Sequence, residues 1–177
     1  MYTPLDPTAV LAALISGNQR HVDRLAAGRS PQPAPVQEPP QPFVVVVEVD
    51  APLVAPLVAP SELFDIAPGW IVLVAWREST AEVTAEVTAA IESAGCGLVV
   101  VLGRMKSRFG GTELEFLREE RRCFDIVAAL LGGGGATAAA VRTGKARIVG
   151  AIADDRDGRV HWLGEHPEQK SLLGTRK

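Results

Sequence analysis

The chain has 177 residues, of which 47% are hydrophobic and 22% are charged, and its formal net charge is −3. This length and balance predict one soluble globular domain with a buried core. The slight negative charge argues against a surface for nucleic acid or anionic membrane, and no apolar run reaches the roughly 20 residues that a membrane helix needs. The N-terminus lacks the basic start of a signal peptide, so we expect a cytoplasmic protein with no nucleic-acid or membrane partner.

Cysteine and histidine positions give no metal-binding pattern. Cys96 and Cys123 both lie among apolar residues, which predicts buried structural thiols, although a disulfide between them stays open. The three histidines, at positions 21, 161 and 166, match no known ligand spacing, so we expect structural or surface roles for them.

Residues 1–28 predict an N-terminal helical arm. Asp6 and Pro7 have the form of an N-cap and a first helical residue, and a helical apolar stripe follows them. Gly17 and Asn18 are expected to interrupt or end this helix, with a resumed helix stopping at Gly28. Such an arm can pack on its own domain or on a partner subunit. Residues 29–42 hold six prolines in fourteen residues and predict an extended linker.

Three apolar runs predict the strands of an α/β core domain over residues 43–164. They lie in residues 42–49, 71–75 and 98–102. The first begins at a proline and holds four consecutive valines, which favours a strand buried on both faces. Helical patterns alternate with these runs, and that alternation favours a parallel sheet with right-handed crossovers.

Two capping boxes, at residues 79–82 and 112–115, predict the helix starts in this core. The second helix is expected to turn five apolar side chains inward: Leu114, Leu117, Phe124, Val127 and Leu131. A short helix near residues 136–141 follows. A hairpin with strands at 147–153 and 159–163 closes the core, and residues 165–177 form a polar tail.

Four blocks of the sequence resemble the β-class carbonic anhydrases. The block from Leu11 reads Leu-x-x-Leu-x-x-Gly-Asn-x-Arg-x-Val, and the others are residues 61–69, 98–103 and the closing hairpin. The resemblance implies an α/β fold with a four- or five-stranded, mainly parallel sheet. It also implies a homodimer whose N-terminal helices lie across the partner, with the cleft at the subunit boundary. In working members, a zinc ion held by two cysteines and one histidine generates the hydroxide that attacks carbon dioxide.

The sequence departs from this family at the zinc ligands. The family pattern Cys-x-Asp-x-Arg falls, in two alternative registers, on Val49, Ala51 and Leu53 or on Leu53, Ala55 and Leu57. The pattern Gly-His-x-x-Cys falls on residues 103–107, where Arg104 replaces the histidine and Ser107 the cysteine. Zinc needs three or four N, S or O donors. We therefore expect no zinc, no other cofactor and no hydration of carbon dioxide.

The loops after the three predicted strands are expected to converge on one cleft. Asp50 or Glu78 is the candidate acid or base of any remaining reaction. Further candidates are side chains suited to a small anionic or carbonyl ligand: Trp76, Arg77, Arg104, Lys106, Ser107 and Arg108. In the alternative interpretation, the charged residues are solvent-exposed loop residues that form salt bridges with one another, and Ser79 is a helix cap.

Three functions compete on this basis. The first is a zinc-free protein that binds a small anionic or carbonyl ligand or acts as a dimeric scaffold. The second is a repurposed metal-independent lyase, hydratase or hydrolase acting on a small carboxylate or carbonyl compound. The third, a minor alternative, is a zinc enzyme with ligands such as Cys96, Cys123 and a histidine.

Overall fold

The computed structural model describes residues 5–29, 42–49, 58–76, 80–105, 112–132 and 134–174. Its five strands form one sheet in the order β2-β1-β3-β4-β5. They are β1 (Val44–Glu48), β2 (Ile71–Ala75), β3 (Leu98–Met105), β4 (Arg147–Asp154) and β5 (Val160–Gly164). The first four are parallel, and β5 pairs antiparallel with β4. The predicted α/β class and mainly parallel sheet are confirmed.

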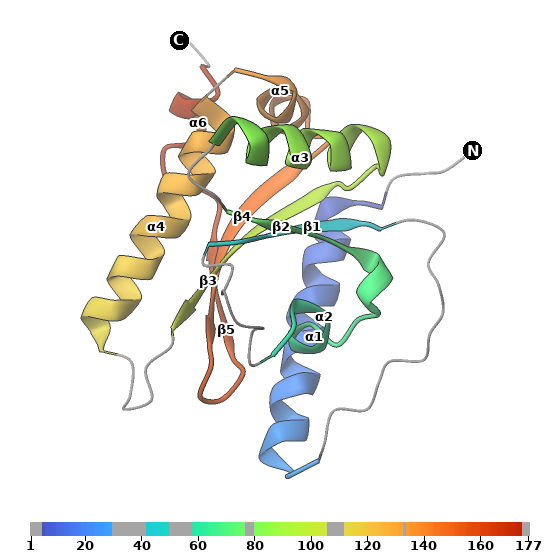
Figure 1. Ribbon diagram of the computed structural model, residues 1–177, viewed down its shortest axis with the longest axis vertical. Coiled ribbons are helices and arrows are strands. Elements are labelled where there is room, and N and C mark those ends of the chain that lie inside the picture. The colour runs from blue at the N-terminus through green and yellow to red at the C-terminus, as the bar shows by residue number, and fades with distance from the viewer. Residues whose placement is uncertain are drawn as a thin grey trace.

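Helices cover both faces of the sheet (Figure 1). One face carries α1 (Pro7–Ala26) and α2 (Pro60–Leu63), and the other carries α3 (Thr80–Ser93), α4 (Glu113–Gly132) and α5 (Ala136–Arg142). A 3-10 turn, Pro68–Trp70, precedes β2, and α6 (Gln169–Leu172) lies in the tail. No single helix in the described part of the chain is long and apolar enough to cross a membrane.

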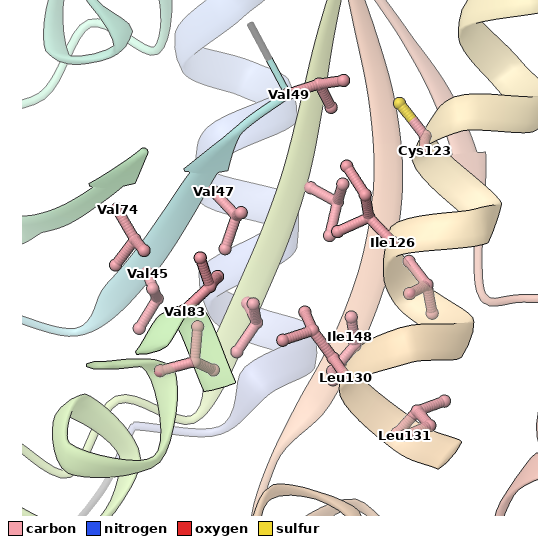
Figure 2. Packing of buried hydrophobic residues seen from close by; sticks show 14 of the residues in the cluster. Val45, Val47, Val49, Val74, Val83, Cys123, Ile126, Leu130, Leu131 and Ile148 are labelled. Carbon is pink, nitrogen blue, oxygen red and sulfur yellow. The ribbon is translucent and has the colours of Figure 1, made fainter. Parts of the chain in front are cut away.

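The valine run is buried on both faces, as predicted. Val45 and Val47 join the cluster under α3 and α4, which Figure 2 shows, while Val44 and Val46 join the cluster under α1 and α2. Successive side chains of a strand point to opposite faces, so an unbroken apolar run is required where helices cover both faces. All four valines are fully buried.

The predicted break at Gly17 and Asn18 is wrong, because α1 runs without interruption from Pro7 to Ala26. Gly17 instead lies against Phe64, directly after α2, and Asn18 joins α1 to the end of α2 and to the closing hairpin. A Cβ atom on Gly17 would lie 1.9 Å from the carbonyl oxygen of Phe64, so only glycine fits this approach. The Asn18 amide donates to the carbonyls of Leu63 (3.1 Å) and Gly158 (2.8 Å), and its oxygen accepts from the N–H of Val160 (3.0 Å).

Two arginines of α1 add an ion-pair contact to the same segment. Arg20 and Arg24 contact the two carboxylate oxygens of Asp65 at 2.6 and 2.7 Å. Val10 and Leu14 pack in the cluster that also holds β1 and β3 residues. The structure thus places α1 on its own sheet.

The start of α4 differs from the prediction. Its capping box is present, because Thr112 and Glu115 exchange hydrogen bonds of 3.0 and 3.2 Å. Val127 and Leu131 face the core, and Phe124 is half-buried, but Leu114 and Leu117 are 66% and 50% exposed, so their predicted inward orientation is wrong. The buried stripe contains Glu119 and Cys123 in this part of the helix, and the apolar pattern alone did not indicate a buried glutamate.

Several sequence predictions fall outside the described residues. They concern most of the proline-rich linker (residues 30–41), the duplicated loop (residues 50–57) and the loops at residues 77–79 and 106–111. The two alternative registers of the zinc motif beyond Val49 therefore stay open.

Candidate functional site

Two of the candidate residues, Trp76 and Arg104, lie in the described part of the chain at the carboxyl ends of β2 and β3, and Glu48 ends β1 beside them. Glu48 pairs with Ala75 and Leu102 in the sheet register, and its carbonyl accepts a hydrogen bond from the Trp76 N–H at 2.9 Å. Arg104 lies two residues beyond Leu102 on β3. The other candidates lie outside the described residues: Asp50, Arg77, Glu78, Lys106, Ser107 and Arg108.

Arg104 is enclosed by hydrogen-bond acceptors. Its two terminal nitrogens contact a carboxylate oxygen of Asp155 and one of Glu48, each at 3.1 Å, and the second nitrogen also donates to the Val58 carbonyl at 2.8 Å. The side chains of Arg104, Glu48 and Asp155 are 4%, 6% and 14% exposed. We call these three residues the strand-end cluster.

Sequence reasoning missed Asp155 because residues 154–158, which connect the two predicted strands of the closing hairpin, were expected only to form its turn. The signal was present: Asp154 ends β4 and Asp155 follows it, and the carboxyl ends of adjacent parallel strands meet at one edge of a sheet. Asp154 is itself buried and pairs with Arg156, whose hydrogen bonds lower the pKa of the Asp154 carboxyl. Asp155 is thus the residue that completes the strand-end cluster.

The cluster contains two carboxylates and one guanidinium group. Removing one partner from a buried ion pair leaves an uncompensated charge, so the three residues depend on one another. Within the described residues, the Nε atom of Arg104 is buried and has no hydrogen-bond partner. A guanidinium group has five N–H donors, and the three hydrogen bonds above use three of them. The buried Nε–H is therefore a donor that no described residue satisfies.

The metal of the resembled family does not fit the described residues of this site. Val49, at the position of the first cysteine in one register, is a buried hydrocarbon, and Arg104 stands at the position of the histidine. A guanidinium group is permanently charged and offers no lone pair to a metal. No group of three or more His, Cys, Asp or Glu side chains in the described part of the chain has a metal-binding arrangement.

The cysteines and histidines lie apart from one another. Cys96 and Cys123 are buried free thiols, and burial raises their pKa values to about 11 and about 12. Cys96 precedes β3, at the opposite end of the sheet from Arg104. His21 is enclosed on α1, while His161 and His166 contact the rings of Phe116 and Phe124 at centroid distances of 5.6 and 5.3 Å.

A groove of about 770 Å³ lies away from the strand-end cluster. It borders the start of α1, the end of α3, and α5, close to the amino ends of β3 and β4. Its charged lining residues are Asp6, Glu92 and Lys145. Parallel α/β sheets carry their sites at the opposite, carboxyl end, so we assign the candidate site to the strand-end cluster.

Solved structures similar to this chain are β-carbonic anhydrases. CafA of Aspergillus fumigatus is 15% identical, with a TM-score of 0.54, and the match covers 94% of each chain. A carbonic anhydrase from Streptococcus mutans is 19% identical, with a TM-score of 0.43, and the match covers 87% of this chain and 97% of that one. One of two tetrameric β-carbonic anhydrases from Sordaria macrospora is 14% identical, with a TM-score of 0.43, over 89% of this chain and 93% of that one.

The likeness to CafA shows that the chain has the β-carbonic anhydrase fold. No protein-family model matches the sequence, and no curated protein sequence matches it.

Proposed function

We propose that this protein is a zinc-independent member of the β-carbonic anhydrase fold that does not hydrate carbon dioxide and acts as a self-associating binding or scaffold protein. The observation that carries the proposal is the buried position of Arg104 between Glu48 and Asp155. Zinc-bound water owes its reactivity at neutral pH to the metal, which lowers its pKa to about 7. The described strand ends offer hydrogen-bonded carboxylates and a guanidinium group in place of such a metal site.

The ion pairs of Arg104 favour the scaffold role over anion binding by this residue. Both terminal nitrogens already contact carboxylates, so an anion at either nitrogen would have to displace Glu48 or Asp155. Displacement would leave a carboxylate with no paired charge in a buried setting, which costs several kcal/mol. The Nε–H of Arg104, which no described residue satisfies, is the specific feature that favours the ligand-binding alternative, because it suits one carbonyl or carboxylate oxygen of a small molecule.

A stopped-flow assay of carbon dioxide hydration tests the proposal. The purified chain, with and without added zinc, is expected to leave the uncatalysed rate unchanged. An acceleration that depends on enzyme concentration and disappears with a zinc chelator would overturn the proposal.

The repurposed-enzyme alternative needs one of the two acid or base candidates, Asp50 or Glu78. If a metal-independent hydrolase, hydratase or lyase activity is found, Asp50→Asn or Glu78→Gln should reduce its kcat by at least about a hundredfold, the usual contribution of a general acid or base. A scaffold tolerates both changes, and the matched comparison is self-association of the same variants by sedimentation velocity.

A further inference from the structure

The groove at the amino ends of β3 and β4 carries two opposite charges that no described residue pairs with. Glu92, in the last turn of α3, and Lys145, in the turn after α5, both line it. Neither side chain has a hydrogen-bond or ion-pair partner within the described residues. The remaining charged lining residue, Asp6, accepts a hydrogen bond from the Thr8 N–H at 3.1 Å as the N-cap of α1. The groove therefore presents one uncommitted carboxylate and one uncommitted ammonium group.

The α3 side of the groove is rich in hydrogen-bond acceptors. The N–H groups of Ala94 and Cys96 both donate to the Ala90 carbonyl, at 3.2 Å each. The carbonyls of Ile91 and Glu92, which come next along the helix, accept no backbone hydrogen bond from a described residue. Free carbonyls at a helix end carry the negative pole of the helix dipole, so this side of the groove favours a positively charged donor.

The α5 side differs because its terminal carbonyls are already occupied. The N–H groups of Thr143, Gly144 and Lys145 donate to the carbonyls of residues 139–141, at distances between 2.9 and 3.1 Å. The charged group on this side is the Lys145 ammonium, which suits an anionic group of a ligand.

Much of the remaining lining is hydrocarbon. It includes Ile91 from α3, Ala139 and Ala140 from α5, and Leu5 at the start of α1. Leu5 is 49% exposed, so a ligand with a hydrocarbon body would remove apolar surface from water there. The volume of about 770 Å³ lies within the range of roughly 300 to 1,000 Å³ that is usual for small-molecule sites.

We propose that this groove binds a small zwitterion with a hydrocarbon body, such as a linear ω-amino acid. Its ammonium group lies against Glu92 and the free carbonyls of α3, and its carboxylate lies against Lys145. A simple amine leaves the Lys145 charge unmatched, and a simple carboxylate leaves the Glu92 charge unmatched, so a zwitterion complements both sides of the groove. The site goes beyond the proposed function and is independent of it, because the strand-end cluster lies at the opposite end of the sheet.

A titration followed by two-dimensional ¹H–¹⁵N NMR tests the ligand class. 6-Aminohexanoate is expected to shift the amide signals at the end of α3 and in the turn after α5, with a Kd in roughly the millimolar range for a ligand of this size. Hexylamine and hexanoate have the same chain length and should bind at least about threefold more weakly, because each lacks one of the two charged contacts. The absence of saturable shifts at these residues with 6-aminohexanoate and its longer and shorter homologues would overturn the inference. Equally tight binding of either single-charge probe would do the same.

Variants that remove one charge test the assigned residues. Glu92→Gln and Lys145→Gln are each expected to raise the Kd of 6-aminohexanoate by about threefold to tenfold. Glu82→Gln is the matched control, because it removes an exposed carboxylate from the first turn of the same helix, outside the groove, and it should leave the Kd unchanged. Ala139→Leu fills the groove while keeping a good helix former, so it should abolish binding.

Circular dichroism and thermal unfolding verify that each variant folds. An unchanged Kd in Glu92→Gln or Lys145→Gln would overturn the charge assignment, and unchanged binding by Ala139→Leu would place the ligand elsewhere. Zinc content and hydration activity report separately on the proposed function, so the two conclusions fail independently.

Discussion

Two regions of the molecule differ in how far they match the sequence pattern of the β-class carbonic anhydrases. In the contact between α1 and the segment after α2, the resembled Gly17-Asn18-x-Arg20 pattern is present, and each of its members makes a defined contact. At the strand ends, Arg104 stands where the resemblance places a zinc-ligating histidine, and in one of the two registers Val49 stands where it places a cysteine. The first region determines where α1 lies on the sheet. The second region determines what chemistry is possible at the carboxyl ends of the strands. A shared fold therefore does not by itself carry a shared site.

The largest effect is expected from breaking the strand-end cluster. Arg104→Met removes the guanidinium and leaves the Glu48 and Asp155 carboxylates without their partner, which should lower the free energy of unfolding by about 3–5 kcal/mol. Urea unfolding at neutral pH measures the loss. Arg121→Met is the control: the Arg121–Asp125 pair is 84% and 73% exposed, so a change within about 0.5 kcal/mol is expected.

A triple variant separates charge from packing in the same cluster. Adding Glu48→Gln and Asp155→Asn to Arg104→Met removes both uncompensated charges, and most of the lost stability should return because a buried ionic group can often be replaced at little net cost. If the triple variant is as unstable as Arg104→Met alone, the cost arises from packing and the electrostatic account of the cluster is wrong.

The contact between α1 and Phe64 should be the next most sensitive. Gly17→Ala adds a Cβ atom 1.9 Å from a backbone oxygen, so α1 must shift, and we expect a loss of about 1–3 kcal/mol in the free energy of unfolding. Gly132→Ala in α4 is the matched helical control, because no described residue outside its own helix backbone and chain neighbours lies within 4 Å of its Cβ position. The control is expected to be neutral or slightly stabilising, since alanine favours helix over glycine. Equal effects in both variants would contradict the close-contact explanation.

The smallest effect is a pH dependence at the same helix. Burial lowers the pKa of His21 below its ordinary value, with the nearby Glu62 and Asp65 carboxylates opposing the shift and Arg24 adding to it. Its imidazole also lies against Gly158 of the hairpin. The folded protein thus favours neutral His21, and this stability is present above the unfolded pKa of about 6.5 and is lost as pH falls below it.

Urea midpoints between about pH 7 and pH 5 check this sign. Wild type should lose more stability on acidification than His21→Gln, which has no titrating group at this position. Asp65 and Asp154 do not contribute to the difference in pH dependence between wild type and His21→Gln. Despite their burial, their arginine partners hold their pKa values below the ordinary aspartate range. An identical pH dependence in wild type and variant would exclude His21 as the source.

The sequence was sufficient for the sheet because its signals are local. Four valines in a row indicate a strand buried on both faces whatever the rest of the chain does, and Thr112 with Glu115 indicates a helix start. Long-range contacts were not predictable in the same way. Gly17 was interpreted as a helix break because its close neighbour, Phe64, lies far along the chain, and Asp155 was missed because its partner Arg104 belongs to another strand.

The same limit explains the partial prediction of the site. Arg104 was expected at the strand end, and its replacement of a metal-ligating histidine followed from the resemblance. The pairing of its guanidinium with Glu48 and Asp155 could not be predicted in the same way. This pairing depends on the order of β1, β3 and β4 in the sheet. Leu114 and Leu117 were expected inward because they fit the apolar stripe of α4, yet this end of the helix presents them to solvent.

The most direct test of the central claim is the zinc content of the protein. The full chain, purified without a metal-binding tag and dialysed against zinc and then against zinc-free buffer, would be measured by elemental analysis beside a zinc-binding β-carbonic anhydrase treated in parallel. We predict a zinc content near zero per chain, because Arg104 and its carboxylate partners occupy the strand ends. Near-stoichiometric zinc, retained in wild type and lost on substitution of Cys96, Cys123 or a histidine, would contradict the account and restore metal-hydroxide chemistry.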